Sequence, residues 1–87
     1  SMTYKVNVMI LRDQAERRGI RSVEELSEIS GVNRDMLLPV LEGRSLPSFD
    51  IMLKLASALE LSPELAGRIF FDDNLRNGKK EEGYGEG

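Results

Sequence analysis

Residues that end helices and residues that begin them follow one another at short intervals along this chain. Gly19 comes before Ser22, Gly31 before Asn33, Gly43 before Ser48, and Ser62 directly precedes Pro63. Glycine is favoured just after a helix, Ser and Asn cap helix starts through their side-chain oxygens, and proline suits the first helical position. These signals divide the chain into segments that are long enough only for short helices.

Apolar residues recur at helical spacing inside these segments. They are Val8, Leu11 and Ala15 in the first, Leu26 and Ile29 in the second, Met36, Leu37, Val40 and Leu41 in the third, Phe49, Met52, Leu55, Ala56 and Leu59 in the fourth, and Leu65, Ile69 and Phe70 in the fifth. We therefore predict an all-α fold, a compact bundle of five short helices. The helices are expected near residues 8–18, 23–30, 33–42, 49–59 and 63–70.

The start of the second helix is the best defined of the five. Ser22 and Glu25 have the spacing of a capping box, in which the serine caps the helix and the glutamate reaches back to the backbone before it. The first helix has a weaker start signal, because Asn7 can cap it but residues 4–8 also alternate. That alternation favours a short extended arm or strand.

These helices define one domain over residues 8–71. Residues 1–7 are predicted to form an N-terminal arm, and residues 72–87 a flexible polar tail, because the end of the chain is polar and rich in glycine. We interpret Ser1, in front of Met2, as a remnant of cloning. No long apolar run is present, so we expect neither a signal peptide nor a transmembrane helix.

The chain contains no cysteine and no histidine. Disulfides, thiolate chemistry, His-dependent triads and metal sites built from His or Cys are therefore excluded. No acid pair has the pattern of a catalytic dyad, and no glycine-rich loop follows a strand. We expect a protein that is not an enzyme and uses no cofactor, metal or small-molecule substrate. The absence of cysteine fits a cytoplasmic protein.

The formal net charge of the chain is −3 at pH 7. Residues 1–69 hold nine Lys or Arg and ten Asp or Glu, whereas the last eighteen residues hold three and five. The helical part is thus near neutral and the tail supplies most of the acidity. DNA-binding domains usually carry a basic surface, so a local patch would have to serve that purpose here.

Residues 23–42 have the pattern of two helices joined by a tight turn. A small residue, Ser27, lies where the helices would cross, and Gly31 follows four positions later, where a turn requires positive φ. Four apolar residues are spaced to lock the two helices together, namely Leu26, Val32, Leu37 and Val40. This combination is the signature of a helix-turn-helix.

The wider sequence resembles the Cro/lambda-repressor type of helix-turn-helix family, also called XRE-like, over about residues 8–70. The residues that carry the resemblance are Gly31-Val32-Asn33 at the turn, Gly43, Pro47-Ser48, Met52-Leu53-Lys54-Leu55-Ala56-Ser57-Ala58-Leu59, and Leu61-Ser62-Pro63-Glu64-Leu65. The Ile69-Phe70-Phe71 ending is similar to that of small phage or mobile-element regulators. The resemblance implies a transcriptional regulator, a repressor, that binds double-stranded DNA as a homodimer. Its recognition helix, residues 33–42, would enter the major groove.

Seven residues are the candidates for DNA contact: Ser22, Asn33, Arg34, Asp35, Met36, Leu38 and Arg44. Asn33 and Ser22 cap helices and could each touch a phosphate. Arg34, in the first turn of the recognition helix, is the candidate for pairing with guanine, the alternative being a solvated side chain. Asp35 either complements the helix dipole or accepts from a cytosine amine.

The remaining candidates divide between DNA and protein contact. Met36 and Leu38 could press on thymine methyl groups or belong to a protein interface. Arg44 fits a phosphate contact just after the recognition helix. An arginine cluster before the second helix, Arg17, Arg18 and Arg21, forms either a positive rim or a complement to the dipole of the first helix.

Three residues depart from the family pattern. Pro39 deletes one backbone hydrogen bond and is expected to kink or loosen the recognition helix. Val23 cannot clamp a phosphate as the family's usual glutamine does, and Glu42 brings a negative charge towards the DNA backbone. These departures support an alternative, a protein-interaction module on a helix-turn-helix scaffold with weakened DNA binding.

Overall fold

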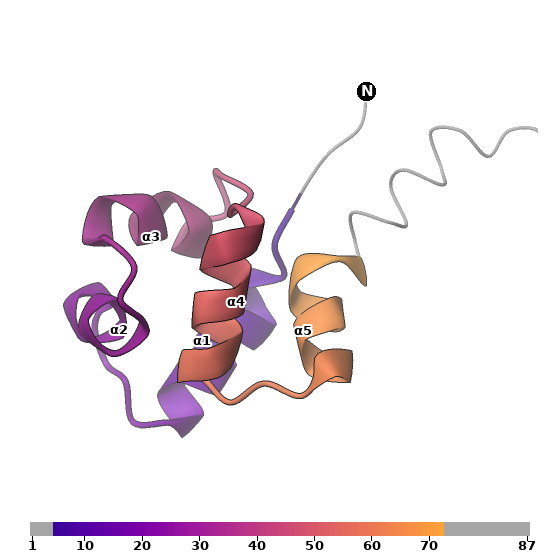
Figure 1. The fold of residues 1–87 in the computed structure, drawn as a ribbon, viewed down its shortest axis with the longest axis horizontal. Helices are drawn as coiled ribbons and strands as arrows, with labels where there is room; N and C mark the ends of the chain where they lie inside the picture. Colours follow the sequence, from indigo (N-terminus) through magenta and orange to yellow (C-terminus); the bar gives the residue numbers. More distant parts are fainter. Residues whose placement is uncertain (1–4, 73–87) are drawn as a thin grey trace, which may run out of the picture.

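The computed structural model describes residues 5–72 and contains five α-helices and no strand within that range (Figure 1). The helices are α1 (Val8–Arg17), α2 (Val23–Ser30), α3 (Arg34–Leu41), α4 (Phe49–Ala58) and α5 (Pro63–Phe70). The predicted all-α class is confirmed, and each helix lies where the start and stop signals placed it. The predictions for residues 1–4 and for most of the polar tail concern positions outside the described residues.

Each helix begins at the cap that the sequence indicated. The side-chain oxygens of Asn7, Ser22, Asn33, Ser48 and Ser62 accept hydrogen bonds from the backbone N–H groups of Ile10, Glu25, Asp35, Ile51 and Leu65. The glutamate of the predicted capping box also reaches back, as expected, and it does so to the residue before the cap. The carboxylate of Glu25 accepts from the backbone N–H of Arg21 at 2.8 Å, one residue before the cap.

All five helices contribute buried side chains to the core, α5 through Ile69 and Phe70. In Figure 1, α4 runs along the front of the molecule, with α1 behind it, α2 and α3 on one side and α5 on the other. Leu11 of α1, Leu37 of α3 and Leu55 of α4 are completely buried in this core. Val6, from the predicted arm, is also buried, and the backbone N–H of Asn7 donates to the carbonyl of Ile69 at 2.8 Å.

Two apolar residues that were expected in the core are exposed. Ile29 lies about 60° around α2 from Leu26, on the side away from the partly buried Val23, and 52% of its surface is accessible. Phe49, at the first position of α4, lies about 120° around the helix from the buried Leu55 and is 66% accessible. In both cases the buried stripe of a short helix is narrower than the apolar pattern suggested.

Arg12 of α1 and Arg18, which caps the C-terminal end of α1, bind the ends of other helices. Arg12 donates from Nε and Nη2 to the carbonyl of Leu41, the last residue of α3, at 3.2 and 2.9 Å. The Nε of Arg18 donates to the carbonyl of Leu59 at the end of α4, at 3.1 Å. The terminal carbonyls of a helix lack partners within the helix, so these contacts fasten α3 and α4 to α1. Arg18 thus binds the end of α4 while it also caps the end of α1.

Pro39 does not interrupt α3. The helix continues from Arg34 through Pro39 to Leu41. Buried side chains on both sides of the proline, Leu37 and Val40, anchor the helix, and the Pro39 carbonyl accepts from the backbone N–H of Arg44 at 2.8 Å. Tertiary packing therefore offsets the hydrogen bond that proline removes.

Candidate nucleic-acid interface

The turn between α2 and α3 is fixed by one glycine and two hydroxyl groups. Gly31 has φ of 76°, in the left-handed region where glycine is preferred, and its N–H donates to the Ser27 carbonyl at 2.8 Å. The Ser27 hydroxyl donates to the carbonyl of Val32, and the Ser30 hydroxyl accepts from the N–H of Val32 at 3.2 Å. The sequence indicated the turn glycine and a small residue at Ser27, but not the hydrogen bonds of the Ser27 and Ser30 hydroxyl groups.

Apolar contacts hold α3 against α2. The four residues predicted to lock the helices are all buried, namely Leu26, Val32, Leu37 and Val40. With these side chains inside, the first turn of α3 faces solvent. Arg34, Asp35 and Met36 are exposed, and Met36 has 56% of its surface accessible. Asn33 is exposed too, with its side chain occupied as the cap.

Arg34 forms an ion pair with α2. Its Nε lies 2.7 Å from Oε2 of Glu24, and its Nη1 lies 3.8 Å from Oδ1 of Asp35. The hydrogen bond from Arg34 lowers the pKa of Glu24, and the same bond raises the pKa of Arg34. A contact between two helices leaves no periodic signal, so the sequence could not reveal it.

Arg44 is also paired with an acid. Its Nη2 and Nε lie 2.6 and 2.8 Å from Oε1 of Glu42, the residue that caps the C-terminal end of α3. Both arginines proposed to contact DNA therefore have a carboxylate within hydrogen-bond distance. The local positive charge of this surface is reduced, and DNA would have to compete with these exposed pairs.

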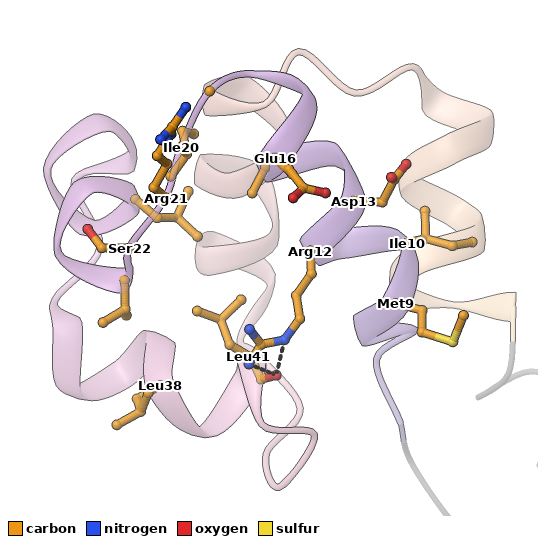
Figure 2. Close-up of a pocket in the computed structure, with 14 residues that line it drawn as sticks. Met9, Ile10, Arg12, Asp13, Glu16, Ile20, Arg21, Ser22, Leu38 and Leu41 are labelled. Carbon is orange, nitrogen blue, oxygen red and sulfur yellow. Dashed lines mark hydrogen bonds between the residues drawn. The ribbon is translucent and has the colours of Figure 1, made fainter.

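Ser22, at the start of α2, and Leu38, one helical turn after Arg34, share a further surface feature. They line an open groove of about 1130 Å³ between α1, α2 and α3 (Figure 2). Its other apolar lining residues include Met9, Ile10, Val23 and Leu41. Figure 2 shows Arg12 reaching from α1 towards α3, where it binds the Leu41 carbonyl.

The seven candidates thus differ in what surrounds them. Residues 33–36 form one exposed group at the start of α3, and Ser22 and Leu38 line the groove. Arg44 follows the other end of α3, a helix about 12 Å long at the usual rise per residue. Within residues 5–72 no cluster of acidic side chains is suited to hold a metal ion. No helix in this range combines the length and the apolar character needed to cross a membrane.

Comparisons of the chain with protein-family models, with curated proteins and with solved structures give no match. The class that the described residues define is that of an all-α protein with five short helices. The resemblance to the Cro/lambda-repressor type of protein therefore rests on the residues themselves and on the packing of α2 and α3 described above.

Proposed function

We propose that this chain binds double-stranded DNA through a helix-turn-helix formed by α2 and α3, and that it acts as a homodimeric transcriptional regulator, a repressor. The observation that carries the proposal is the combination of a left-handed Gly31 turn, a buried apolar lock and an exposed, capped first turn of α3. Such an arrangement presents the N-terminal residues of a helix to the major groove.

The first turn of α3 offers the groups that base recognition needs. The contact between Glu24 and Arg34 uses the Nε of the arginine. Of the two terminal nitrogens of Arg34, Nη1 lies 3.8 Å from Oδ1 of Asp35, and the pairing of arginine with guanine O6 and N7 can use these terminal atoms while Nε stays on Glu24. Glu24 would then orient the arginine. Met36, exposed in the same turn, supplies an apolar contact for a thymine methyl group.

Backbone contacts would come from both sides of α3. Ser22 begins α2, and the N-terminus of a helix attracts phosphate through its free N–H groups. Arg44 follows α3 and would exchange Glu42 for a phosphate oxygen. We propose a binding function and assign no catalytic one.

The ion pairs of Arg34 and Arg44 also favour a second candidate, a protein-interaction module. Each pair neutralises a charge that DNA binding would use. Leu38 and Val23 give the neighbouring groove an apolar lining, and Val23 has no group to hold a phosphate. A helix of a partner protein is the ligand that such a groove would fit.

A fluorescence-anisotropy titration on mixed-sequence duplex DNA at two salt concentrations separates the two candidates. DNA binding should weaken steeply as salt rises, because binding releases counterions from the phosphates. Arg34→Ala and Arg44→Ala should each weaken binding, and on a selected operator Arg34→Ala should cost about 5- to 100-fold. Arg68→Ala is the matched control, since it removes the same charge from α5.

Two results would contradict the proposal. One is a folded protein that does not bind DNA at low salt, which would favour the interaction module. The other is an equal loss of affinity in Arg34→Ala, Arg44→Ala and Arg68→Ala, since that would reflect net charge rather than a site on α3.

A further inference from the structure

The outer face of α4 carries two large apolar side chains that the fold leaves uncovered. Phe49 is 66% accessible and Leu53 is 54% accessible. Residues four apart lie on the same side of a helix, so the two form one apolar stripe. The opposite side of α4 is buried through Ile51, Met52 and Leu55. Figure 1 shows α4 at the front of the molecule, with α1 behind it.

A charged pair runs beside this stripe. Asp50 and Lys54 are joined by an ion pair, with Oδ2 of Asp50 and Nζ of Lys54 3.2 Å apart, and both side chains are largely exposed. Each charged residue directly follows one apolar residue of the stripe. The face therefore has an aromatic ring and an acid at its N-terminal end, and a leucine and a base one turn later.

We propose that this face, Phe49 and Leu53 with Asp50 and Lys54, is where a second copy of the chain docks, with the two α4 helices antiparallel. A two-fold axis through the middle of the face places Phe49 against Leu53 of the second copy. The same operation places Asp50 opposite Lys54 of the second copy. The contact is isologous, because each surface supplies both halves of the apolar pair and both halves of the charge pair.

Charge complementarity selects the antiparallel arrangement and the second copy as occupant. Parallel helices related by a two-fold axis along their length would carry the charged pairs of the two copies on opposite sides of the contact, so neither charge would gain a partner from the second copy. Antiparallel helices bring opposite charges together at both ends. An unrelated partner would need a matching pattern of its own, whereas this face already matches itself.

The small size of the face limits the affinity of the two copies for each other. One pair of short helices buries less than the roughly 1,200–2,000 Å² of a standard stable interface. The dimer is accordingly weak and depends on concentration, with a dissociation constant in about the micromolar range or above. This inference rests on the homodimer that is part of the proposed function, and it names the surface that forms it.

Sedimentation equilibrium over a wide range of protein concentration, without DNA, tests the surface. The wild-type chain should pass from monomer to dimer as concentration rises. Leu53→Glu should stay monomeric, because it places a carboxylate against Phe49 of the second copy. Ile29→Glu is the matched control: Ile29 is 52% accessible on α2, which lies to one side of α4, and its replacement should leave the dimer intact. Circular dichroism of each variant checks that it is folded.

Two charge variants test the register. Asp50→Lys puts two positive charges on each face, and Lys54→Asp puts two negative charges there, so each variant alone should be monomeric. Mixed together they should form a one-to-one heterodimer, because every charge then meets its opposite. A mixture that stays monomeric overturns the antiparallel pairing. A dimer that survives in Leu53→Glu overturns the α4 surface.

The same preparations distinguish this inference from the proposed DNA binding. A wild-type chain that remains monomeric at high concentration, yet binds DNA in a salt-sensitive manner, overturns the inference and leaves DNA binding standing. A dimer that is lost in Leu53→Glu supports the inference even where the titration detects no DNA binding.

Discussion

Among single residues, Glu24 and Arg34 make the contact that matters most for the first turn of α3, because it holds the Arg34 side chain in position. The ion pair is exposed, so its contribution to stability is small and is reduced further by salt. Its effect on function is larger, because it fixes the position of a guanidinium group next to the proposed DNA surface. Glu24 is thus a positioning residue for Arg34 in the proposed function.

The titration of Glu24 should report this pair directly. The hydrogen bond from Arg34 holds the pKa of Glu24 below its ordinary value of 4.5. Its contribution to stability is therefore present above the ordinary pKa and is lost as pH falls through the lowered one. In Arg34→Ala the pKa of Glu24 should rise, as a carboxyl-carbon NMR titration of both proteins would measure. An unchanged pKa would mean that the pair does not persist in solution.

Gly31 and Gly67 form a matched pair for testing backbone conformation. A methyl group at either position would meet no other atom within 4 Å, but only Gly31 has positive φ, at 76°. Gly31→Ala should lower the free energy of unfolding by about 1–2 kcal/mol, because an L-residue is strained there. Gly67→Ala, inside α5, should raise it by about 0.5–1 kcal/mol. Urea denaturation measures both, and equal effects would contradict the assigned turn.

On the scale of helices, the contact between Arg12 and Leu41 explains how α3 stays in place despite Pro39. The arginine crosses from α1 and gives the end of α3 two hydrogen bonds. Arg12→Ala should lower the free energy of unfolding by about 1–2 kcal/mol, since it leaves a helix-terminal carbonyl without its charged donor.

Arg17→Ala is the control for that variant. Arg17 also lies on α1 and forms an ion pair, but its partner is Asp13 on the same helix and both side chains are exposed. Its removal should change stability much less than that of Arg12. Equal losses in thermal unfolding would show that general charge effects, rather than the link between α1 and α3, are responsible.

The helices were predictable from sequence because their signals are local. Ser22, Asn33 and Gly31 act on backbone groups within a few residues of themselves, so their spacing alone indicates where α2 ends and α3 begins. The pairing of Arg34 with Glu24 and the reach of Arg12 to Leu41 join different helices. Only the folded chain brings those groups together, and no periodic pattern in the sequence predicts these contacts.

The error over Ile29 has a related cause. Its spacing from Leu26 suits a buried stripe on α2. The stripe can extend to either side of Leu26, and packing against the other helices decides which side is buried. The side that carries Val23 is partly buried, and the side that carries Ile29 is exposed. The groove beside α1 is likewise absent from the sequence pattern, because Ser22, Leu38 and the α1 residues that line it meet only in the folded chain.

For the molecule as a whole, the near-neutral charge of the helical part limits how DNA could be bound. A strongly basic domain binds DNA through its overall field, whereas this chain, with a net charge of −3, cannot. Affinity would have to come from a few oriented groups, repeated by two-fold symmetry. A weak dimer that doubles those contacts on one duplex is consistent with this requirement, because two linked sites bind far more tightly than one.

The dimer should also appear in thermal unfolding. A partner that binds only the folded chain stabilises it by mass action, so the melting temperature of a dimer depends on protein concentration. Above the dissociation constant, each tenfold rise in concentration should raise the melting temperature by about 3–6 °C for a chain of this size. In Leu53→Glu the melting temperature should not change with concentration, whereas Ile29→Glu should behave as the wild type does. A melting temperature that is independent of concentration in all three proteins would mean that the outer face of α4 stays uncovered in solution.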